Sequence, residues 1–175
     1  MAKNLVTGTV MSNIGFHKYL KDMGCETRAT DVGDRYVLED MLKTGGIIGG
    51  EQSGHIIFLD KTTTGDGILS SIQLVRAVLK SGKNASELSD EIKIYPQVLV
   101  NAKVTNENKK RYTEDEEVVK AFDEVSAKLG DTGRLLVRPS GTEPLVRVMI
   151  EGEDTESITE MAEELADMLS KKFGC

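Results

Sequence analysis

The sequence has no tryptophan, and aromatic residues make up only 5% of its 175 residues, so aliphatic side chains and methionine must fill the core. Its two cysteines, Cys25 and Cys175, form neither a metal-ligand spacing nor a disulfide framework, which favours a reducing compartment. No apolar run is long enough to span a membrane, and no basic region followed by an apolar core opens the chain. These absences predict a cytoplasmic protein without a signal peptide or a membrane partner.

Positive charge is also scarce, because 22 basic residues face 29 acidic ones and give a formal net charge of −7. Such a chain lacks the basic face that a nucleic-acid partner requires. Any bound anion must therefore be held by a local basic cluster against the overall field.

Residues 1 to about 95 alternate strand and helix signals, which is typical of a layered α/β domain with a mainly parallel sheet. The pattern predicts strands at 4–11, 26–30, 47–50 and 56–59. Asn13 is expected to cap a first helix, and Gly24 to close it. The expected apolar positions of the next helices are Leu38, Met41 and Leu42, then Ile68, Ile72, Val75 and Leu79; Ser86 is expected to open a short helix over 87–92.

From about residue 96 the order becomes strand, helix, strand, strand, helix, which predicts a separate α+β domain. We place the boundary near residues 93–99, with domains at 1–95 and 96–175. Strands are expected at 95–104, 134–138 and 145–150, a polar loop at 106–113, and helices at 114–129 and 155–172. The inward positions of the two helices are expected to be Val118, Phe122, Val125, Leu129, Ile158, Met161, Ala162, Leu165, Met168 and Leu169.

The segment Arg-Pro-Ser-Gly-Thr-Glu-Pro-Leu-Val-Arg at 138–147 is the first candidate for chemistry. Its prolines stiffen the turn, and successive N–H groups at Ser140, Gly141 and Thr142 are expected to converge on an anion. Arg138 and Arg147 flank the turn and are suited to grip a phosphate through their planar guanidinium groups. The alternative is a rigid hairpin whose two surface arginines pair with Glu143 and Glu151.

The second candidate is the glycine-bounded loop Gly-Gly-Glu-Gln-Ser-Gly-His at 49–55. Glu51 offers an acceptor, Ser53 a hydroxyl that donates and accepts, and His55 a titratable imidazole. This set suits the vicinal hydroxyls of a sugar. The alternative is a mobile turn whose polar groups face water.

Two shorter motifs complete the candidates. Thr-Thr-Thr-Gly-Asp-Gly at 62–67 contains one aspartate, Asp66, which a helix cap explains better than a magnesium site that needs further carboxylates or phosphate. Val-Gly-Asp-Arg at 32–35 is a tight turn into a helix, with Asp34 as the expected cap and Arg35 either solvated or facing a ligand. No motif supplies an obvious nucleophile.

Together the four motifs, in this order and across essentially the whole chain, resemble those of the α-D-phosphohexomutase superfamily. The particular residues in these motifs resemble those of its phosphoglucosamine mutase branch. The resemblance implies the C-terminal part of an isomerase of bacterial amino sugar metabolism, which interconverts glucosamine 6-phosphate and glucosamine 1-phosphate for UDP-N-acetylglucosamine and peptidoglycan precursors. It also implies a catalytic phosphoserine and a Mg²⁺ loop in earlier domains of the same protein, with glucosamine 1,6-bisphosphate as intermediate and activator. Residues 1–95 would be most of the third domain, without its start, and residues 96–175 the fourth.

Carried over by position, the resemblance implies that Glu51 and Ser53 bind sugar hydroxyls, and that His55 lines the pocket and helps proton transfer. The residues implied to hold the distal phosphate are Arg138, Ser140, Gly141, Thr142 and Arg147, with Gly33, Asp34 and Arg35 as further site candidates. One departure is Asp31, since many relatives in related branches carry lysine there.

The resemblance further implies that this chain has no catalytic residue for the transfer itself, holds no metal, and is inactive alone. Two alternatives remain open: a phosphomannomutase or phosphoglucomutase with another sugar, and a stand-alone module that binds phosphosugars without catalysis.

Overall fold

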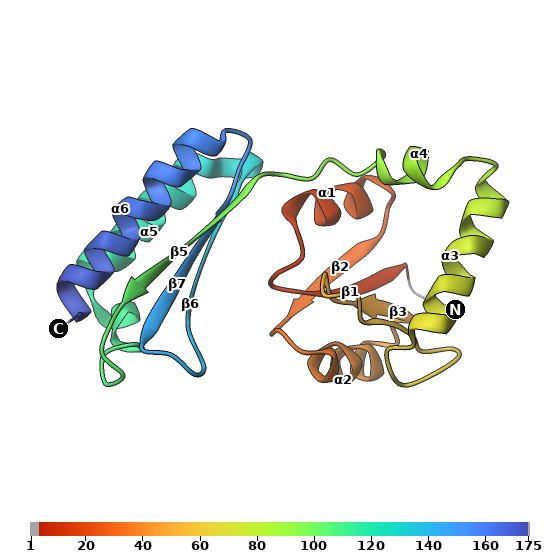
Figure 1. The fold of residues 1–175 in the computed structure, drawn as a ribbon, viewed down its shortest axis with the longest axis horizontal. Helices are drawn as coiled ribbons and strands as arrows, with labels where there is room; N and C mark the ends of the chain where they lie inside the picture. Colours follow the sequence, from red (N-terminus) through yellow and green to blue (C-terminus); the bar gives the residue numbers. More distant parts are fainter. Residues whose placement is uncertain (1–3, 175) are drawn as a thin grey trace. The chain divides into compact units, whose positions relative to one another are not determined.

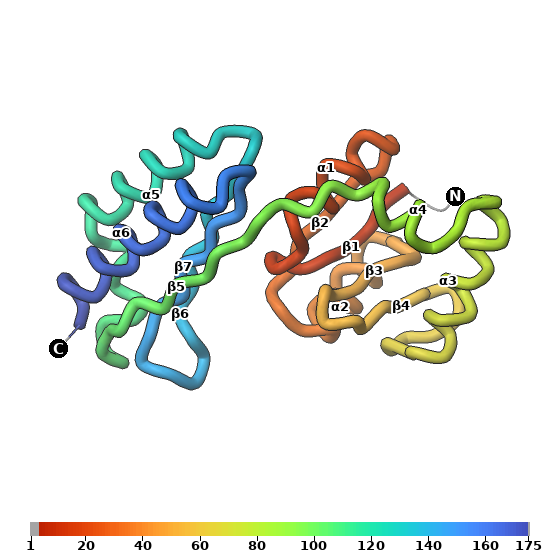
Figure 2. The backbone as a smooth tube through the Cα atoms, turned by 45° about the horizontal axis from the view of Figure 1, so that its top comes forward, coloured from red at the N-terminus to blue at the C-terminus, as the bar shows by residue number. Residues whose placement is uncertain are grey.

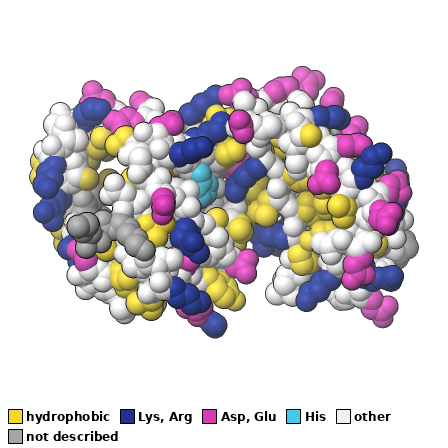
Figure 3. Space-filling model, turned by 180° about the vertical axis from the view of Figure 1, so that it is seen from behind, with side chains coloured by type: hydrophobic (Ala, Val, Ile, Leu, Met, Phe, Trp, Pro, Cys, Tyr) yellow, Lys and Arg dark blue, Asp and Glu magenta, His cyan; other side chains and the backbone are white. Residues whose placement is uncertain are grey.

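The computed structural model describes residues 4–174, so the expectation for Cys175 lies outside the described residues. The chain divides into two compact units, one ending at Ile94 and one beginning at Tyr95. The expected fold class, an α/β unit followed by an α+β unit, is confirmed. Figure 1 shows the two sets of elements, and both acidic and basic side chains are spread over the face seen in Figure 3.

The first unit is a four-stranded sheet with flanking helices. Its elements are β1 (Leu5–Thr9), α1 (Ile14–Asp22), β2 (Glu26–Thr30), α2 (Asp34–Thr44), β3 (Ile48–Gly50), β4 (Ile56–Phe58), α3 (Gly67–Ser81) and α4 (Ala85–Ser89). The strand order is β2-β1-β3-β4, with β1 parallel to both neighbours and β4 antiparallel to β3. Helices α1 and α2 lie on opposite faces of this sheet (Figure 1). The sheet is therefore mainly parallel, as the alternating pattern predicts.

Local capping sets most helix ends in this unit. The Asn13 side chain accepts a hydrogen bond from the backbone N–H of Gly15, and the Asp66 side chain accepts from Ile68 and Leu69, as expected for N-caps. Two expected caps are wrong. Gly33, not Asp34, precedes α2, so Asp34 is its first helical residue, and Asn84, not Ser86, caps α4 through a reciprocal capping box with Glu87.

The core of the first unit is small. Val37 and Met41 of α2 pack with Ile57 of β4, and all three are buried. Leu42, expected on the inner side of α2, is 61% exposed, because the buried stripe runs through Val37 and Met41 instead. The expected apolar positions of α3, Ile68, Ile72, Val75 and Leu79, are exposed as well, although their helical spacing predicts a buried face.

The second unit is a three-stranded antiparallel sheet covered by two long helices. Its elements are β5 (Gln97–Lys103), η1 (Arg111–Glu114), α5 (Glu116–Leu129), η2 (Gly130–Thr132), β6 (Arg134–Pro139), β7 (Leu145–Glu151) and α6 (Thr155–Phe173). The strand order is β5-β7-β6, so β7 is central. Helices α5 and α6 lie side by side on one face of the sheet (Figures 1 and 2).

A continuous core forms between this sheet and its helices. The predicted stripes are confirmed, because Val118, Val125 and Leu129 of α5 are buried and Phe122 packs beside them. Every predicted inward position of α6 is likewise in the cluster or packed against it. Alternate residues of the strands face these helices, which leaves the other face of the sheet without helices. That face carries Arg138 and Arg147.

Candidate functional site

The candidate sugar loop is a tight hairpin between β3 and β4. The N–H of Glu51 donates to the carbonyl of His55 over 2.9 Å, and the N–H of Gly54 donates to the carbonyl of Glu51 over 3.0 Å. Gly54 has a φ of 98°, a conformation that favours glycine. The side chains of Ser53 and His55 are exposed, with Oγ and Nδ1 joined by a 3.2 Å hydrogen bond whose direction depends on the imidazole tautomer.

Glycine at position 49 is required by close packing beneath this hairpin. A Cβ there would lie 2.7 Å from the Met41 sulfur and 2.8 Å from both the Thr7 carbonyl oxygen and a Val37 methyl group. Such distances are too short for real contacts, so glycine lets α2 pack directly on β3. This close packing fixes the position of the hairpin between β3 and β4 relative to α2.

Tertiary contacts bring three separate motifs together at this hairpin. The Glu51 carboxylate accepts a hydrogen bond of 3.2 Å from the N–H of Gly33, which ties the hairpin to the turn before α2. Gly65 lies against the imidazole, since a Cβ at that position would be 3.5 Å from the His55 Cδ2 atom. The motifs at 32–35, 49–55 and 62–67 therefore form one cluster within the first unit.

Arg35 and Asp34 lie at the exposed edge of this cluster. The Arg35 guanidinium pairs with Glu39 over 3.0 Å, and its carbon lies 5.5 Å from the centre of the Tyr36 ring. The exposed pair with Glu39 raises the pKa of Arg35 above its ordinary value. Arg35 is thus engaged along its own helix. The exposed Asp34 does not cap the helix, and its side chain forms no hydrogen bond or ion pair within residues 4–174.

The motif at 62–67 acts as a helix start. Both N–H bonds to the Asp66 carboxylate are 2.9 Å long. Within residues 4–174 there is no group of three histidine, cysteine, aspartate or glutamate side chains arranged to hold a metal ion. The described residues therefore do not fit a magnesium site.

In the second unit, the antiparallel register places the two candidate arginines directly opposite each other. Arg138 of β6 pairs with Arg147 of β7, and Arg147 also pairs with Asn101 of β5. Paired residues point to the same face of a sheet, so both guanidinium groups rise from the face opposite α5 and α6. Two like charges at directly opposed positions are unfavourable without an anion nearby.

The turn between these strands is internally bonded. Ser140 is buried, its N–H donates to the Leu145 carbonyl over 2.9 Å, and its Oγ accepts from the Glu143 N–H over 3.2 Å. The expectation that three successive amides converge on an anion is therefore wrong for the Ser140 amide, which the hairpin already uses. Gly141 and Thr142 are exposed, so only their amides remain as candidates.

The alternative of a rigid hairpin with paired arginines holds for one arginine only. Arg147 Nη2 lies 3.1 Å from Glu143 Oε2, but Glu151 pairs with Arg134 over 2.7 Å rather than with either candidate. Arg138 forms no salt bridge with any residue of the described part of the chain. The Nε atom of Arg147 is buried and has no hydrogen-bond partner there. An anion between the two strands would satisfy this donor.

Two polar residues near this turn were missed by sequence reasoning. The Lys109 ammonium donates to the Ser140 carbonyl over 3.0 Å, which joins the loop after β5 to the turn. Asn101 extends the arginine pair into a row of three side chains. Neither has a local signal, because Lys109 stands in an ordinary polar loop and Asn101 in an alternating strand.

Two family descriptions match the chain. "Phosphoglucomutase/phosphomannomutase, alpha/beta/alpha domain III" matches residues 1–95, and "Phosphoglucomutase/phosphomannomutase, C-terminal domain" matches residues 99–168. The phosphoglucosamine mutase of Alkaliphilus metalliredigens is 54% identical over 172 residues, which are 98% of this chain and 38% of that protein. The chain thus spans less than two fifths of this relative.

Solved structures show the same fold at lower identity. The Aspergillus fumigatus N-acetylphosphoglucosamine mutase in complex with glucose 1,6-bisphosphate has a TM-score of 0.77 at 20% identity, over 98% of this chain and 39% of that one. The same enzyme in complex with GlcNAc-6P and magnesium has a TM-score of 0.69 at 20% identity, over 94% and 41%. No helix in residues 4–174 is both long and apolar enough to cross a membrane.

Proposed function

Because the chain belongs to the phosphoglucomutase/phosphomannomutase family, we propose that it is the C-terminal part of an enzyme that interconverts glucosamine 6-phosphate and glucosamine 1-phosphate. Its relatives at 54% identity are phosphoglucosamine mutases. In the proposed reaction a serine outside this chain carries the phosphoryl group, and a bisphosphorylated sugar is the intermediate. This chain supplies recognition, which is a large part of phosphoryl-transfer catalysis.

The first unit, proposed as the third domain, would recognise the sugar. The Gly33 contact holds the Glu51 carboxylate in place through one oxygen and leaves the other to accept from a sugar hydroxyl. Ser53 and His55 are exposed, and a hydrogen bond joins their side chains. A sugar hydroxyl that binds Ser53 would therefore be linked to the imidazole through the Ser53 hydroxyl. We assign His55 a supporting part in proton transfer, and Gly33, Asp34 and Arg35 to the rim of the same cluster.

The second unit, proposed as the fourth domain, would hold the phosphate that does not react. The observation that carries this proposal is the direct pairing of Arg138 with Arg147 on the helix-free face, where the buried Nε–H of Arg147 has no partner among residues 4–174. Gly141 and Thr142 would add amide donors, and Ser140 would fix the turn. Glu143 now occupies one side of Arg147, so a phosphate dianion would have to displace it.

Magnesium enters only through the rest of the protein. Its ligands would lie outside this chain, because the described residues include no suitable cluster and Asp66 is used as a cap. The phosphosugar and the earlier domains of the same protein are the proposed partners.

Phosphate binding tests the assignment of the second unit. The 175-residue chain is titrated with inorganic phosphate and with glucosamine 6-phosphate while backbone amide resonances are followed. We expect the resonances of residues 138–147 to shift, and Arg138→Gln or Arg147→Gln to weaken binding about tenfold, which corresponds to one lost charge-assisted contact. Arg111→Gln, an exposed arginine of the same unit, is the matched control. Equal binding by all three variants would contradict the phosphate site.

A chimera tests the whole activity. Residues 1–175 replace the matching segment of the Alkaliphilus relative, and turnover is compared for glucosamine, mannose and glucose 6-phosphates. We expect turnover by the chimera, with glucosamine 6-phosphate preferred, and none by the 175-residue chain alone. Preference for another sugar would favour a phosphomannomutase or phosphoglucomutase, and turnover by the chain alone would refute the division of labour.

A further inference from the structure

The strand β2 is the edge of the first sheet. Among the described residues it pairs only with β1, and at the ends of this pairing the Glu26 N–H donates to the Asn4 carbonyl while the Thr30 carbonyl accepts from the Val10 N–H. Along a strand, backbone groups of successive residues point to opposite sides in the plane of the sheet. The backbone N–H and C=O groups of Thr27 and Ala29 therefore point outward from the sheet, where another strand can pair with them.

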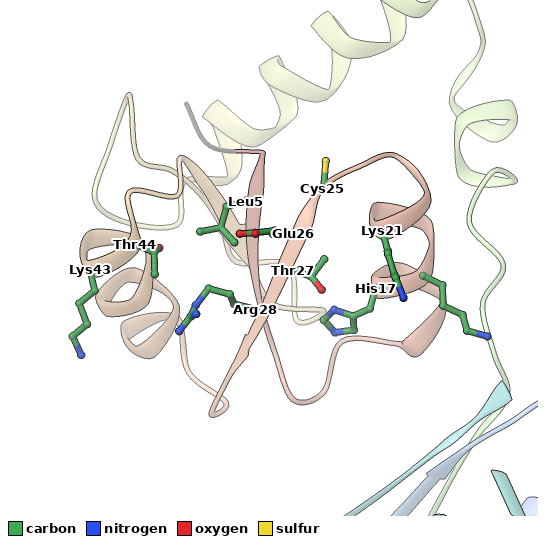
Figure 4. Close-up of a pocket in the computed structure, with 10 residues that line it drawn as sticks. Leu5, His17, Lys21, Cys25, Glu26, Thr27, Arg28, Lys43 and Thr44 are labelled. Atoms are coloured by element: carbon green, nitrogen blue, oxygen red, sulfur yellow. The ribbon is translucent and has the colours of Figure 1, made fainter. Parts of the chain in front are cut away.

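A groove of about 810 Å³ follows this edge and is lined by both flanking helices as well as by β2 (Figure 4). His17, Lys18 and Lys21 line it from α1, and Lys43 lines it from the end of α2. The figure shows the His17 and Lys21 side chains on one side of β2, and Arg28 and Lys43 on the other.

The charge of the groove is opposite to that of the chain. The residues that line the groove include four cationic side chains, Lys18, Lys21, Arg28 and Lys43, and one carboxylate, Glu26, whereas the whole chain carries −7. Arg28 pairs with Asp40 over 2.9 Å but remains half exposed. Lys21 and Lys43 are exposed, and neither forms a salt bridge with another residue in the 4–174 range. Lys21 and Lys43 are therefore the two lysines of the groove that can form new ion pairs with an acidic partner.

We propose that this edge is a docking site for an acidic extended polypeptide segment, which adds to β2 as a fifth strand. The outward backbone groups of Thr27 and Ala29 would supply the hydrogen bonds, as in other cases of strand addition. Side chains of an added strand alternate between the two faces of the sheet. Carboxylates on one face would meet Lys21, and those on the other would meet Arg28 and Lys43. This site lies outside both proposed recognition loops and does not depend on the mutase activity.

The test uses the 175-residue chain and a blocked eight-residue peptide of alternating glutamate and threonine. Amide resonances and hydrogen exchange are measured by NMR with and without the peptide. We expect slower exchange at the Thr27 and Ala29 amides, and binding that weakens as salt is raised. A peptide with lysine in place of glutamate should not bind. The same acidic peptide with alternate backbone nitrogens methylated should bind weakly, because it keeps its charge but loses its donors.

Variants separate the two contributions. Lys21→Glu with Lys43→Glu should weaken binding about tenfold through lost and reversed ion pairs. Lys128→Glu on α5 with Lys171→Glu on α6, both exposed lysines of the second unit, gives a matched charge change elsewhere. Ala29→Pro removes only the outward N–H, which edge strands tolerate, and should also abolish exchange protection at Thr27. Equal binding of the methylated peptide would show a nonspecific surface that binds polyanions without strand pairing. Absence of binding would mean that the lysines only prevent other strands from pairing with the edge. Either result overturns the proposal.

Discussion

At the scale of single residues, the second unit contains an ion pair between a fully buried carboxylate and a partly buried guanidinium. The Glu151 side chain is fully buried, and the Arg134 guanidinium binds it through two contacts, 2.7 Å from Nε and 3.2 Å from Nη2. The two residues are direct neighbours across β6 and β7. A buried carboxylate needs such a partner, because its desolvation is otherwise uncompensated.

Removing one partner should therefore cost much more than removing both. We expect Arg134→Met to lower the free energy of unfolding by about 3–5 kcal/mol, and Arg134→Met combined with Glu151→Met to recover much of that loss. Arg138→Met is the control, since it is on the same strand and the same face. Urea unfolding of five proteins measures this: the wild-type chain, Arg134→Met, Glu151→Met, the double variant and Arg138→Met. Additive effects of the Arg134 and Glu151 substitutions would contradict the coupling.

At the scale of elements, α3 is a helix whose apolar stripe faces solvent. Ile68, Ile72, Val75 and Leu79 recur at helical spacing, yet they are 57–78% exposed, and α3 contains no buried residue. Periodicity gave the helix and its start at Asp66, but it could not tell which surface would cover the stripe. A continuous exposed apolar stripe of this kind favours hydrophobic ligands and self-association.

The exposure of α3 can be measured with a hydrophobic fluorescent dye. We expect the chain to bind the dye, and Ile68→Gln with Leu79→Gln to remove most of that binding. Each change should alter the free energy of unfolding by no more than about 0.5 kcal/mol, as is usual for surface positions. Leu42→Gln, on the exposed side of α2, should leave dye binding unchanged. A loss of several kcal/mol would instead show that the stripe is packed.

At the scale of the whole molecule, the two units differ in the size of their cores. The second unit buries residues of β5, β7 and both long helices in one cluster, with partly buried residues of β6 packed against it, whereas the buried cluster of the first comprises Val37, Met41 and Ile57 among the described residues. Since stability follows buried apolar area, the units should unfold separately, with the first less stable.

Calorimetry should therefore resolve two transitions in the 175-residue chain, and residues 95–175 expressed alone should reproduce the upper one. Met41→Ala should lower only the first transition, by about 2–5 kcal/mol in free energy. Val148→Ala should lower only the second. One transition that responds to both substitutions would show that the units fold as a single cooperative body.

The sequence by itself determined the order of the main elements, the helix caps at Asn13 and Asp66, and the motifs of both loops. Asn13, Asp66 and the glycines that end helices act through hydrogen bonds and backbone angles within a few residues, so local reading suffices for them. The buried positions of α5 and α6 could also be predicted from their spacing, because the sheet that covers them lies in the same small unit.

Tertiary structure alone decided which distant groups meet. Only the register of β6 and β7 sets Arg138 opposite Arg147. Only in the folded hairpin does the Ser140 N–H donate to the Leu145 carbonyl. The contact between Glu51 and Gly33 joins residues 18 positions apart, and the exposure of α3 depends on which segment lies beside it. The physical reason is that pairing and burial depend on segments remote in the chain, whereas helix starts and turns depend on immediate neighbours.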